Sequence, residues 1–360
     1  ELVNYKKILL LYGRGSIKDN GIYDQVISTL SKLSCEVFEY SGIGENPEVE
    51  ICWNAVKLVK DKNIDFILAV GGGSVIDAAK FISLVYESKS PEYAWDIVQR
   101  KQEVPNSILP LGCILTVPGT GTEINKAFVI SRKETEHKLS FYDHSLFPKF
   151  SILDPEFTFS LSKKQTAYGI VDTFMHVLEQ YMTKSDYVLL QDRQAEAILK
   201  TLIETAKPLL ENLNDYDLRS TVMWCSTQAQ DGTISRGVNM DWATHEIGHI
   251  LTASYNIPHA QTLSVTFGNL YKIKIEEKKS KLVQYGKRIW NLEGKDDEIA
   301  YKSIDLTESF FEELGLFIKI DDLGISKMEL SKKIRDYYKV NTPNHIDIES
   351  ACKIFVEGNI

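Results

Sequence analysis

The chain has 360 residues, of which 43% are hydrophobic and 25% charged, and its formal net charge at pH 7 is -9. This composition is typical of a globular protein large enough for two domains. The negative charge and the lack of a long basic run argue against nucleic acid as a partner. No apolar run approaches the ~20 residues of a membrane span. The five cysteines are scattered without a CxxC pair, which favours a reducing, cytoplasmic location.

Short apolar runs of strand type alternate with amphipathic stretches over residues 1–155. The expected strands are 8–12, 36–40, 66–70, 108–117 and 151–153, and a ribbon is expected from 128–131 and 138–141. The expected helices are 22–33, 49–60 and 75–86. This order of strands and helices predicts a parallel, Rossmann-like α/β domain.

The pattern changes after Asp154-Pro155, a dipeptide that favours the end of an element. Nearly every later segment has helical spacing. The expected helices are 166–181, 189–210, 218–230, 242–254, 263–276 and 306–313. Residues 156–360 are therefore predicted to form an all-α domain.

A glycine-rich loop, Gly71-Gly72-Gly73-Ser74, joins an expected strand to an expected helix. Glycines let a diphosphate approach the backbone, and the N–H groups at a helix start stabilise its charge. The loop matches neither GxGxxG nor the P-loop pattern. Its place after a parallel strand nevertheless favours phosphate binding over a simple turn. Asp77 and Lys80 follow in the helix, where a structural role and a ligand role are both open.

A second loop, Gly13-Arg14-Gly15-Ser16, ends the first strand, in the region where dinucleotide folds meet the adenosine ribose. An acidic residue there would bind a free 2′-hydroxyl, whereas this loop carries Arg14 and Ser16, with Lys18 nearby. Cations and a hydroxyl suit a 2′-phosphate, so NADP(H) is favoured over NAD(H). A third polar loop, 116–123, also follows a strand, and its hydroxyls are candidates to line a cofactor cleft.

Acidic and histidine side chains form two pairs with helical spacing in the second half of the chain. These are Asp172 with His176 and His245 with His249, and His259 follows. Residues four apart share one face of a helix, so each pair can direct two side chains at one point. A single histidine on an apolar helix is usually a core residue, but this set favours Fe(II) or Zn(II). Spacing alone leaves open which of His245 and His249 is a ligand.

The segment from His245 to His249 also reads H-E-x-x-H, the zinc-binding pattern of many peptidases. The further offsets of a metzincin fall on Thr252 and Tyr255, which excludes that class. Glu276 or Glu277 remains available as a third ligand. A peptidase, however, has no use for a dinucleotide domain, so this function is the less favoured alternative.

Three segments together resemble the iron-containing (group III) alcohol dehydrogenases: GGGSVIDAAK, GIVDTFMHVLEQ and DWATHEIGHILTASYNIPHA. The nearest branch is that of NADPH-dependent butanol dehydrogenases and aldehyde reductases, and the similarity runs along nearly the whole chain. Arg14 replaces a glycine common in this branch, and Gly119 an alanine. The resemblance implies a Rossmann-like N-terminal domain, a helical C-terminal domain of dehydroquinate synthase-like architecture, an active site between them, and a homodimer.

The resemblance also implies roles for single residues. Asp172, His176, His245 and His259 would be the metal ligands, and His249 would lie beside the metal as a candidate for proton delivery. The implied cofactor contacts are Gly13, Arg14, Ser16, Gly72, Gly73, Ser74, Thr116, Thr120, Asn125 and Lys138.

The function implied is hydride transfer between NADP(H) and short primary alcohols or aldehydes, with Fe²⁺ or Zn²⁺ polarising the substrate oxygen. An alternative with the same architecture is a lyase related to dehydroquinate synthase. That enzyme acts on a multiply charged substrate and would need a dense set of cations near the metal. The segments around Asp172 and His245 lack such a set.

Overall fold

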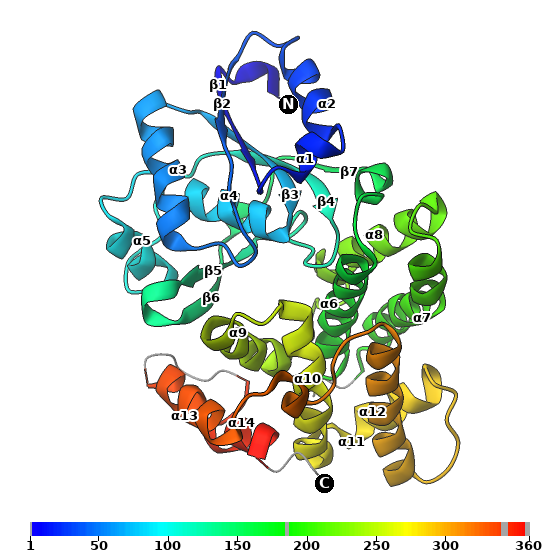
Figure 1. Cartoon of the computed structure of the whole chain (residues 1–360). Helices are drawn as coiled ribbons and strands as arrows, with labels where there is room; N and C mark the ends of the chain where they lie inside the picture. Colours follow the sequence, from blue (N-terminus) through cyan, green and yellow to red (C-terminus); the bar gives the residue numbers. More distant parts are fainter. Residues whose placement is uncertain (1, 184–186, 340–344, 357–360) are drawn as a thin grey trace. The chain divides into compact units, whose positions relative to one another are not determined.

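The computed structural model describes residues 2–183, 187–339 and 345–356 (Figure 1). It divides into two compact units, Glu1–Leu161 and Ser162–Ile360. The 3₁₀ helix Pro155–Thr158 belongs to the first unit, so the division lies beyond the expected boundary at residue 155. No helix among the described residues is long and apolar enough to cross a membrane.

The first unit contains a five-stranded parallel sheet in the order β2-β1-β3-β4-β7. The strands are β1 Lys7–Tyr12, β2 Glu36–Tyr40, β3 Phe66–Gly72, β4 Leu111–Val117 and β7 Ser151–Leu153. The strand order reverses direction between β1 and β3. Ligands of open parallel sheets bind at the carboxyl ends of the strands beside such a reversal. The loops that follow β1 and β3 are the two glycine-rich loops identified from the sequence.

Helices and a ribbon complete this unit. The helices are α1 Ser16–Asp19, α2 Ile22–Leu30, α3 Val49–Lys62, α4 Gly73–Val85 and α5 Pro91–Val98, and the antiparallel ribbon is β5 Ala127–Arg132 with β6 His137–Tyr142. Helix α4 is buried along nearly its whole length because it packs against both β3 and β5. Helix α5 was not expected from the sequence, although Ser90 caps it by accepting a hydrogen bond from the Tyr93 N–H at 3.2 Å.

The second unit is helical throughout its described residues. Its helices are α6 Lys163–Tyr181, α7 Leu189–Glu211, α8 Tyr216–Gln230, α9 Ala243–Tyr255, α10 His259–Ile273, α11 Ile275–Arg288, α12 Asp296–Glu313, α13 Lys327–Tyr338 and α14 Ile348–Val356, with a 3₁₀ turn at Ile320–Leu323. Helix α6 is buried over most of its length and packs against α7, α8 and α10. The two units together confirm the predicted fold class.

Two helix boundaries differ from the sequence prediction in a way that affects the site. The expected helix 263–276 begins earlier, at His259, directly after Pro258 at the N-cap position, where the missing proline N–H costs no helical hydrogen bond. The same helix ends at Ile273, and Lys274 separates it from α11. His259 therefore lies in the first turn of α10 instead of in a preceding loop.

Candidate metal centre and cofactor loops

Helix α6 supplies the first pair of candidate ligands. Its start is defined by a capping box, in which Ser162 accepts from the Gln165 N–H and the Gln165 side chain accepts from the Ser162 N–H. Asp172 and His176 lie on one face of this helix, and Asp172 Oδ1 is 3.6 Å from His176 Nδ1. Both side chains are buried. The helix therefore holds a carboxylate and an imidazole at one point, as their spacing predicted.

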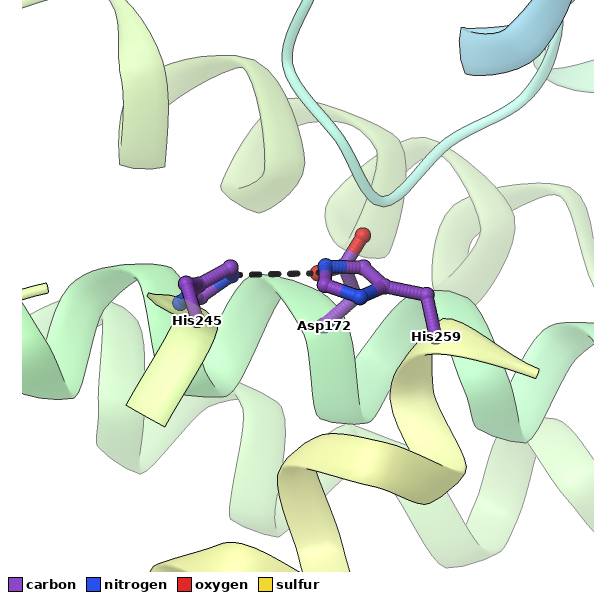
Figure 2. Close-up of side chains that lie close together, drawn as sticks. All are labelled: Asp172, His245 and His259. Atoms are coloured by element: carbon purple, nitrogen blue, oxygen red, sulfur yellow. Dashed lines mark ion pairs between the residues drawn. The ribbon is translucent and has the colours of Figure 1, made fainter. Parts of the chain in front are cut away.

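Helices α9 and α10 bring two further histidines to the same carboxylate. The Nε2 atoms of His245 and His259 each lie 3.7 Å from Asp172 Oδ1, and the three ligand atoms lie within 4.8 Å of one another. Figure 2 shows the three side chains close together, with a dashed line from the His245 ring to an oxygen of the Asp172 carboxylate. Metal–nitrogen and metal–oxygen bonds are about 2.0–2.2 Å long, so an ion fits among atoms this far apart. His245 Nε2 is buried and has no hydrogen-bond partner among the described residues, which suits a ligand atom.

The other two histidines lie around this group. The His176 ring stacks on the His245 ring with 4.5 Å between centroids, but His176 is not part of the tight three-residue group. His249, one turn after His245 on α9, is half-buried, and its ring centroid is 5.5 Å from that of His259. The structure thus gathers the whole predicted set, with Asp172, His245 and His259 closest together.

Glu179, which was not predicted from the sequence, orients one of the candidate ligands. Its Oε2 is hydrogen-bonded to His245 Nδ1, and its Oε1 accepts from the backbone N–H of Thr244 at 2.6 Å. Glu179 is 1% exposed. Because Glu179 accepts the proton of Nδ1, Nε2 is the nitrogen that can ligate a metal beside Asp172. The available signal was spacing, because Glu179 follows His176 by three residues on α6.

The charges around His245 favour a cation at this point. Burial alone would lower the pKa of His245, but Glu179 and Asp172 outweigh it and raise the pKa to about 9. Two carboxylates therefore hold a proton on this imidazole when no metal is bound. A divalent ion can replace that proton, since metal binding to histidine releases it.

The glutamate of the H-E-x-x-H segment points elsewhere. Glu246 Oε1 accepts from the Tyr338 hydroxyl at 2.7 Å, and Oε2 accepts from the His345 N–H at 3.2 Å. A zinc peptidase needs this glutamate beside the metal as general base. Glu276, offered as a third ligand, forms an ion pair with Lys279 on α11 at 2.9 Å. These contacts argue against the peptidase alternative.

In the first unit, the loop after β3 forms a cradle at the start of α4. Gly72 is the N-cap, and no side chain of a described residue caps this helix. A Cβ atom at Gly72 would lie 2.8 Å from Val117 Cβ, and one at Gly73 would overlap the Thr120 side chain. The glycines therefore let the turn pack directly against the loop that follows β4. Gly72 and Ser74 remain partly exposed, so the uncapped N–H groups fit a phosphate.

The loop after β1 presents Arg14 and Ser16 to solvent, and Gly15 adopts a φ of 123°, which favours glycine. The Arg14 guanidinium lies against Gly44 and lines a pocket of about 60 Å³. The rest of this pocket comes from Gly42, Ile43, Gly44, Glu45, Asn46, Pro47, Glu48 and Ile51. This segment follows β2 and was not expected from the sequence to line a site.

The remaining predicted cofactor contacts are less exposed than Arg14 and Ser16. Lys138 is buried on β6, and its Nζ donates to Asn46 Oδ1 at 2.8 Å, so it contacts the segment that lines this pocket. Asn125 Oδ1 accepts from Lys80 Nζ at 3.0 Å and from the Ala127 N–H at 2.8 Å. Thr116 is buried, whereas Thr120 is half-buried beside Gly73.

Both units match models of one protein family. Residues 1–155 match the model described as iron-containing alcohol dehydrogenase, and residues 166–354 match the C-terminal model of the same family. The chain belongs to the iron-containing alcohol dehydrogenase family. It is 43% identical to the NADPH-dependent aldehyde reductase YqhD of Escherichia coli, over 95% of this chain and 89% of that protein. It is also 43% identical to a probable NADH-dependent butanol dehydrogenase of Bacillus subtilis, over 90% of this chain and 84% of that protein.

Solved structures of this family have the same fold. The crystal structure of E. coli YqhD matches with a TM-score of 0.94 and 40% identity, over 99% of this chain and 92% of that one. A Thermotoga maritima NADH-dependent butanol dehydrogenase matches with a TM-score of 0.93 and 31% identity, over 98% and 91%. This iron-containing alcohol dehydrogenase is thus an oxidoreductase of a family that uses a metal and a nicotinamide cofactor, and the predicted family and enzyme class are confirmed.

Proposed function

We propose that this enzyme transfers hydride between NADP(H) and short primary alcohols or aldehydes, with one Fe²⁺ or Zn²⁺ ion. The observation that carries the proposal is the buried group of Asp172, His245 and His259, whose ligand atoms lie within 4.8 Å of one another. The oxidoreductase family supplies the reaction class, and the names of the relatives supply the substrate class.

All four predicted ligands would contribute to this centre. Asp172, His245 and His259 would hold the ion, and His176 would join them from the adjacent turn of α6. When bound, a divalent ion supplies a Lewis acid that polarises the substrate oxygen. Glu179 keeps His245 in the orientation and tautomer that this requires. His249 is half-buried beside His259, and an imidazole there suits delivery of the proton that the alcohol product needs.

The uncapped start of α4 would bind the cofactor diphosphate, and Arg14 with Ser16 would bind the 2′-phosphate. An acidic residue near the end of β2 is occupied by contacts within the protein. Glu39, at the end of β2, accepts hydrogen bonds from Tyr12 at 2.8 Å and from Tyr23 at 2.6 Å. Both of its oxygens are therefore engaged within the protein. The relatives include NADH- and NADPH-dependent enzymes, so the preference rests on these residues.

Three further properties belong to the same proposal. We infer that reduction of aldehydes is the physiological direction, because an NADP(H) preference favours it. We also propose that the enzyme is a homodimer and that it is located in the cytoplasm. Size-exclusion chromatography with light scattering tests the dimer, and fractionation of the source cells tests the location.

One assay tests the central proposal. NADPH absorbance is followed after butanal is added to anaerobically purified protein, before and after treatment with a chelator, and again after Fe²⁺ or Zn²⁺ is restored. We expect NADPH oxidation that stops on metal removal and returns with one of the two ions. If the metal-free protein oxidised NADPH as fast as the metal-loaded protein, the Lewis-acid role of the metal would be excluded. Failure to oxidise NADPH with any short aldehyde would exclude the function and would favour the lyase, which has no net redox change. Metal analysis of the same preparation identifies the resident ion.

A further inference from the structure

Helix α4 contains a fully buried lysine that the proposed reaction does not use. Lys80 is 0% exposed, and Asp77, almost one turn earlier, is 8% exposed. An ammonium group buried in a protein is costly unless its hydrogen bonds and charge are satisfied. Burial lowers the pKa of Lys80 to about 8, and the negative charge of Asp77 opposes this shift.

Among the residues that the structure describes, every hydrogen bond of Lys80 Nζ goes to one short segment after β4, residues 122–127. The acceptors are the backbone oxygens of Thr122 at 2.6 Å, Asn125 at 2.7 Å and Ala127 at 2.8 Å, with the side-chain oxygens of Thr122 and Asn125 at 3.0 Å each. An ammonium group has three hydrogens, so these acceptors share them. One side chain therefore contacts this segment at Thr122, Asn125 and Ala127.

Asp77 completes this arrangement. Its Oδ1 accepts from the Thr122 hydroxyl at 2.7 Å, and its Oδ2 accepts from the Val129 N–H at 3.1 Å. Thr122 thus joins the two charged side chains. Asp77 and Lys80 together therefore connect α4 to Thr122, and Asp77 also connects α4 to β5 through Val129.

The same loop forms one wall of the predicted diphosphate cradle. Thr120 packs so closely against Gly73 that a Cβ atom there would overlap it, and Val117 packs against Gly72. Thr120 is separated from Thr122 by one residue. A shift of the segment that Lys80 holds would therefore move the side chains that face the start of α4.

We propose that Lys80 is a positioning residue for the cofactor: with Asp77, it holds residues 118–127 against the first turn of α4, so that the dinucleotide meets a preformed cradle. The proposal rests on the NADP(H) binding proposed above. A loop that is ordered before binding does not lose conformational entropy when the ligand arrives, and affinity is higher for that reason.

Three variants of the full chain separate this role from general stability. Lys80→Met removes the ammonium group at similar length. Thr122→Val removes the hydroxyl that joins Asp77 to Lys80 and leaves both charges, so it tests the same arrangement if Lys80→Met does not fold. Ser83→Ala is the matched control, because Ser83 is also buried on α4 but its hydroxyl donates to the backbone of Leu109, away from the cradle.

The first readout is the Kd for NADPH, from fluorescence titration of the metal-loaded protein. We expect Lys80→Met to raise this Kd about tenfold or more, and Thr122→Val to raise it roughly threefold. Ser83→Ala should leave it unchanged within about twofold, even if its Tm falls. A folded Lys80→Met protein with an unchanged Kd would overturn the proposal, as would an equal rise in the control.

The second readout needs no cofactor and distinguishes the two proposals. Hydrogen exchange of the backbone amides in residues 118–127 is compared between the free wild-type chain and the variants. Faster exchange in Lys80→Met and Thr122→Val, but not in Ser83→Ala, is expected. If the wild type binds neither NADPH nor NADH, the proposed function fails while this loop result still stands. If the wild type binds NADPH and the loop exchanges equally in all proteins, the positioning role alone fails.

Discussion

Glu179 and His245 are joined by a buried hydrogen bond between a carboxylate oxygen and Nδ1 of the imidazole. The other carboxylate oxygen accepts from the backbone N–H of Thr244, in the first turn of the helix that carries His245. Glu179 thus holds both the ring and the start of α9. The second nitrogen of the ring, Nε2, lies 3.7 Å from Asp172 as a consequence.

This relationship predicts that Glu179→Gln will weaken metal binding. An amide offers only one acceptor atom, so it cannot serve both Nδ1–H and the Thr244 N–H. Loss of such a partner typically costs about 10–100-fold in metal affinity. Competition with a chromophoric chelator measures the affinity. Glu196→Gln is the control, because Glu196 is also buried in this unit but pairs with Arg288. Equal affinities in Glu179→Gln and the wild type would contradict the orienting role.

The histidines should separate into ligands and a proton donor. His259→Ala is expected to lose metal and butanal reduction together, because it removes one atom of the three-residue group. His249→Ala should retain stoichiometric metal but lower kcat by about 10²-fold, the usual size of a general acid's contribution. Metal content and kcat are measured on the same preparations. Unchanged turnover in His249→Ala would dismiss its role in proton delivery.

Gly248 allows α9 and α10 to approach, and its replacement should disturb the metal centre. A Cβ atom at this position would lie 2.8 Å from Thr262 Oγ1 on α10. Gly248→Ala is therefore expected to lower the free energy of unfolding by about 1–3 kcal/mol and to weaken metal binding. The double variant Gly248→Ala/Thr262→Ala should recover part of both losses, because it removes the clashing hydroxyl. Urea unfolding and chelator competition test this, and equal defects in the single and double variants would exclude the steric explanation.

Arg14→Asp should shift cofactor preference from NADPH toward NADH. A carboxylate repels a 2′-phosphate and can bind a free 2′-hydroxyl, whereas the arginine stabilises the phosphate charge. The ratio of kcat/KM for the two cofactors is expected to change by about 10–100-fold, since charge-assisted contacts contribute about 1.5–3 kcal/mol. Lys32→Asp, an exposed charge reversal in the same unit, provides the control. The same ratio in all three proteins would remove Arg14 from the phosphate site.

Glu246 is expected to stabilise the helical unit and to have no role in butanal reduction. It accepts hydrogen bonds from Tyr338 and from the backbone of His345, so Glu246→Gln and Tyr338→Phe should each destabilise the helical unit by about 1–2 kcal/mol. The double variant should lose less stability than the sum of the two single losses, because both substitutions remove the same hydrogen bond. Butanal reduction per bound metal should stay near the wild-type value. A large loss of kcat in metal-loaded Glu246→Gln would restore a catalytic role for this residue.

The sequence by itself determined the features whose residues lie close together in the chain. The glycine loop before α4 follows a strand directly, and the pair Asp172 and His176 shares a helix face through its spacing. Alternating strands and helices in the first half, and helical spacing in the second, were enough to predict the fold class. These patterns are local because strand and helix periodicity act over a few residues.

The tertiary structure alone decided which distant groups meet. Glu179 reaches His245 across 66 residues, Tyr338 turns Glu246 away from the centre across 92, and Lys80 holds Thr122 across 42. In the sequence, the H-E-x-x-H pattern offered Glu246 as a general base, a ligand role was open for Lys80, and no role was predicted for Glu179. Burial decided among them, because a charged group removed from water must find its partners wherever the fold brings them.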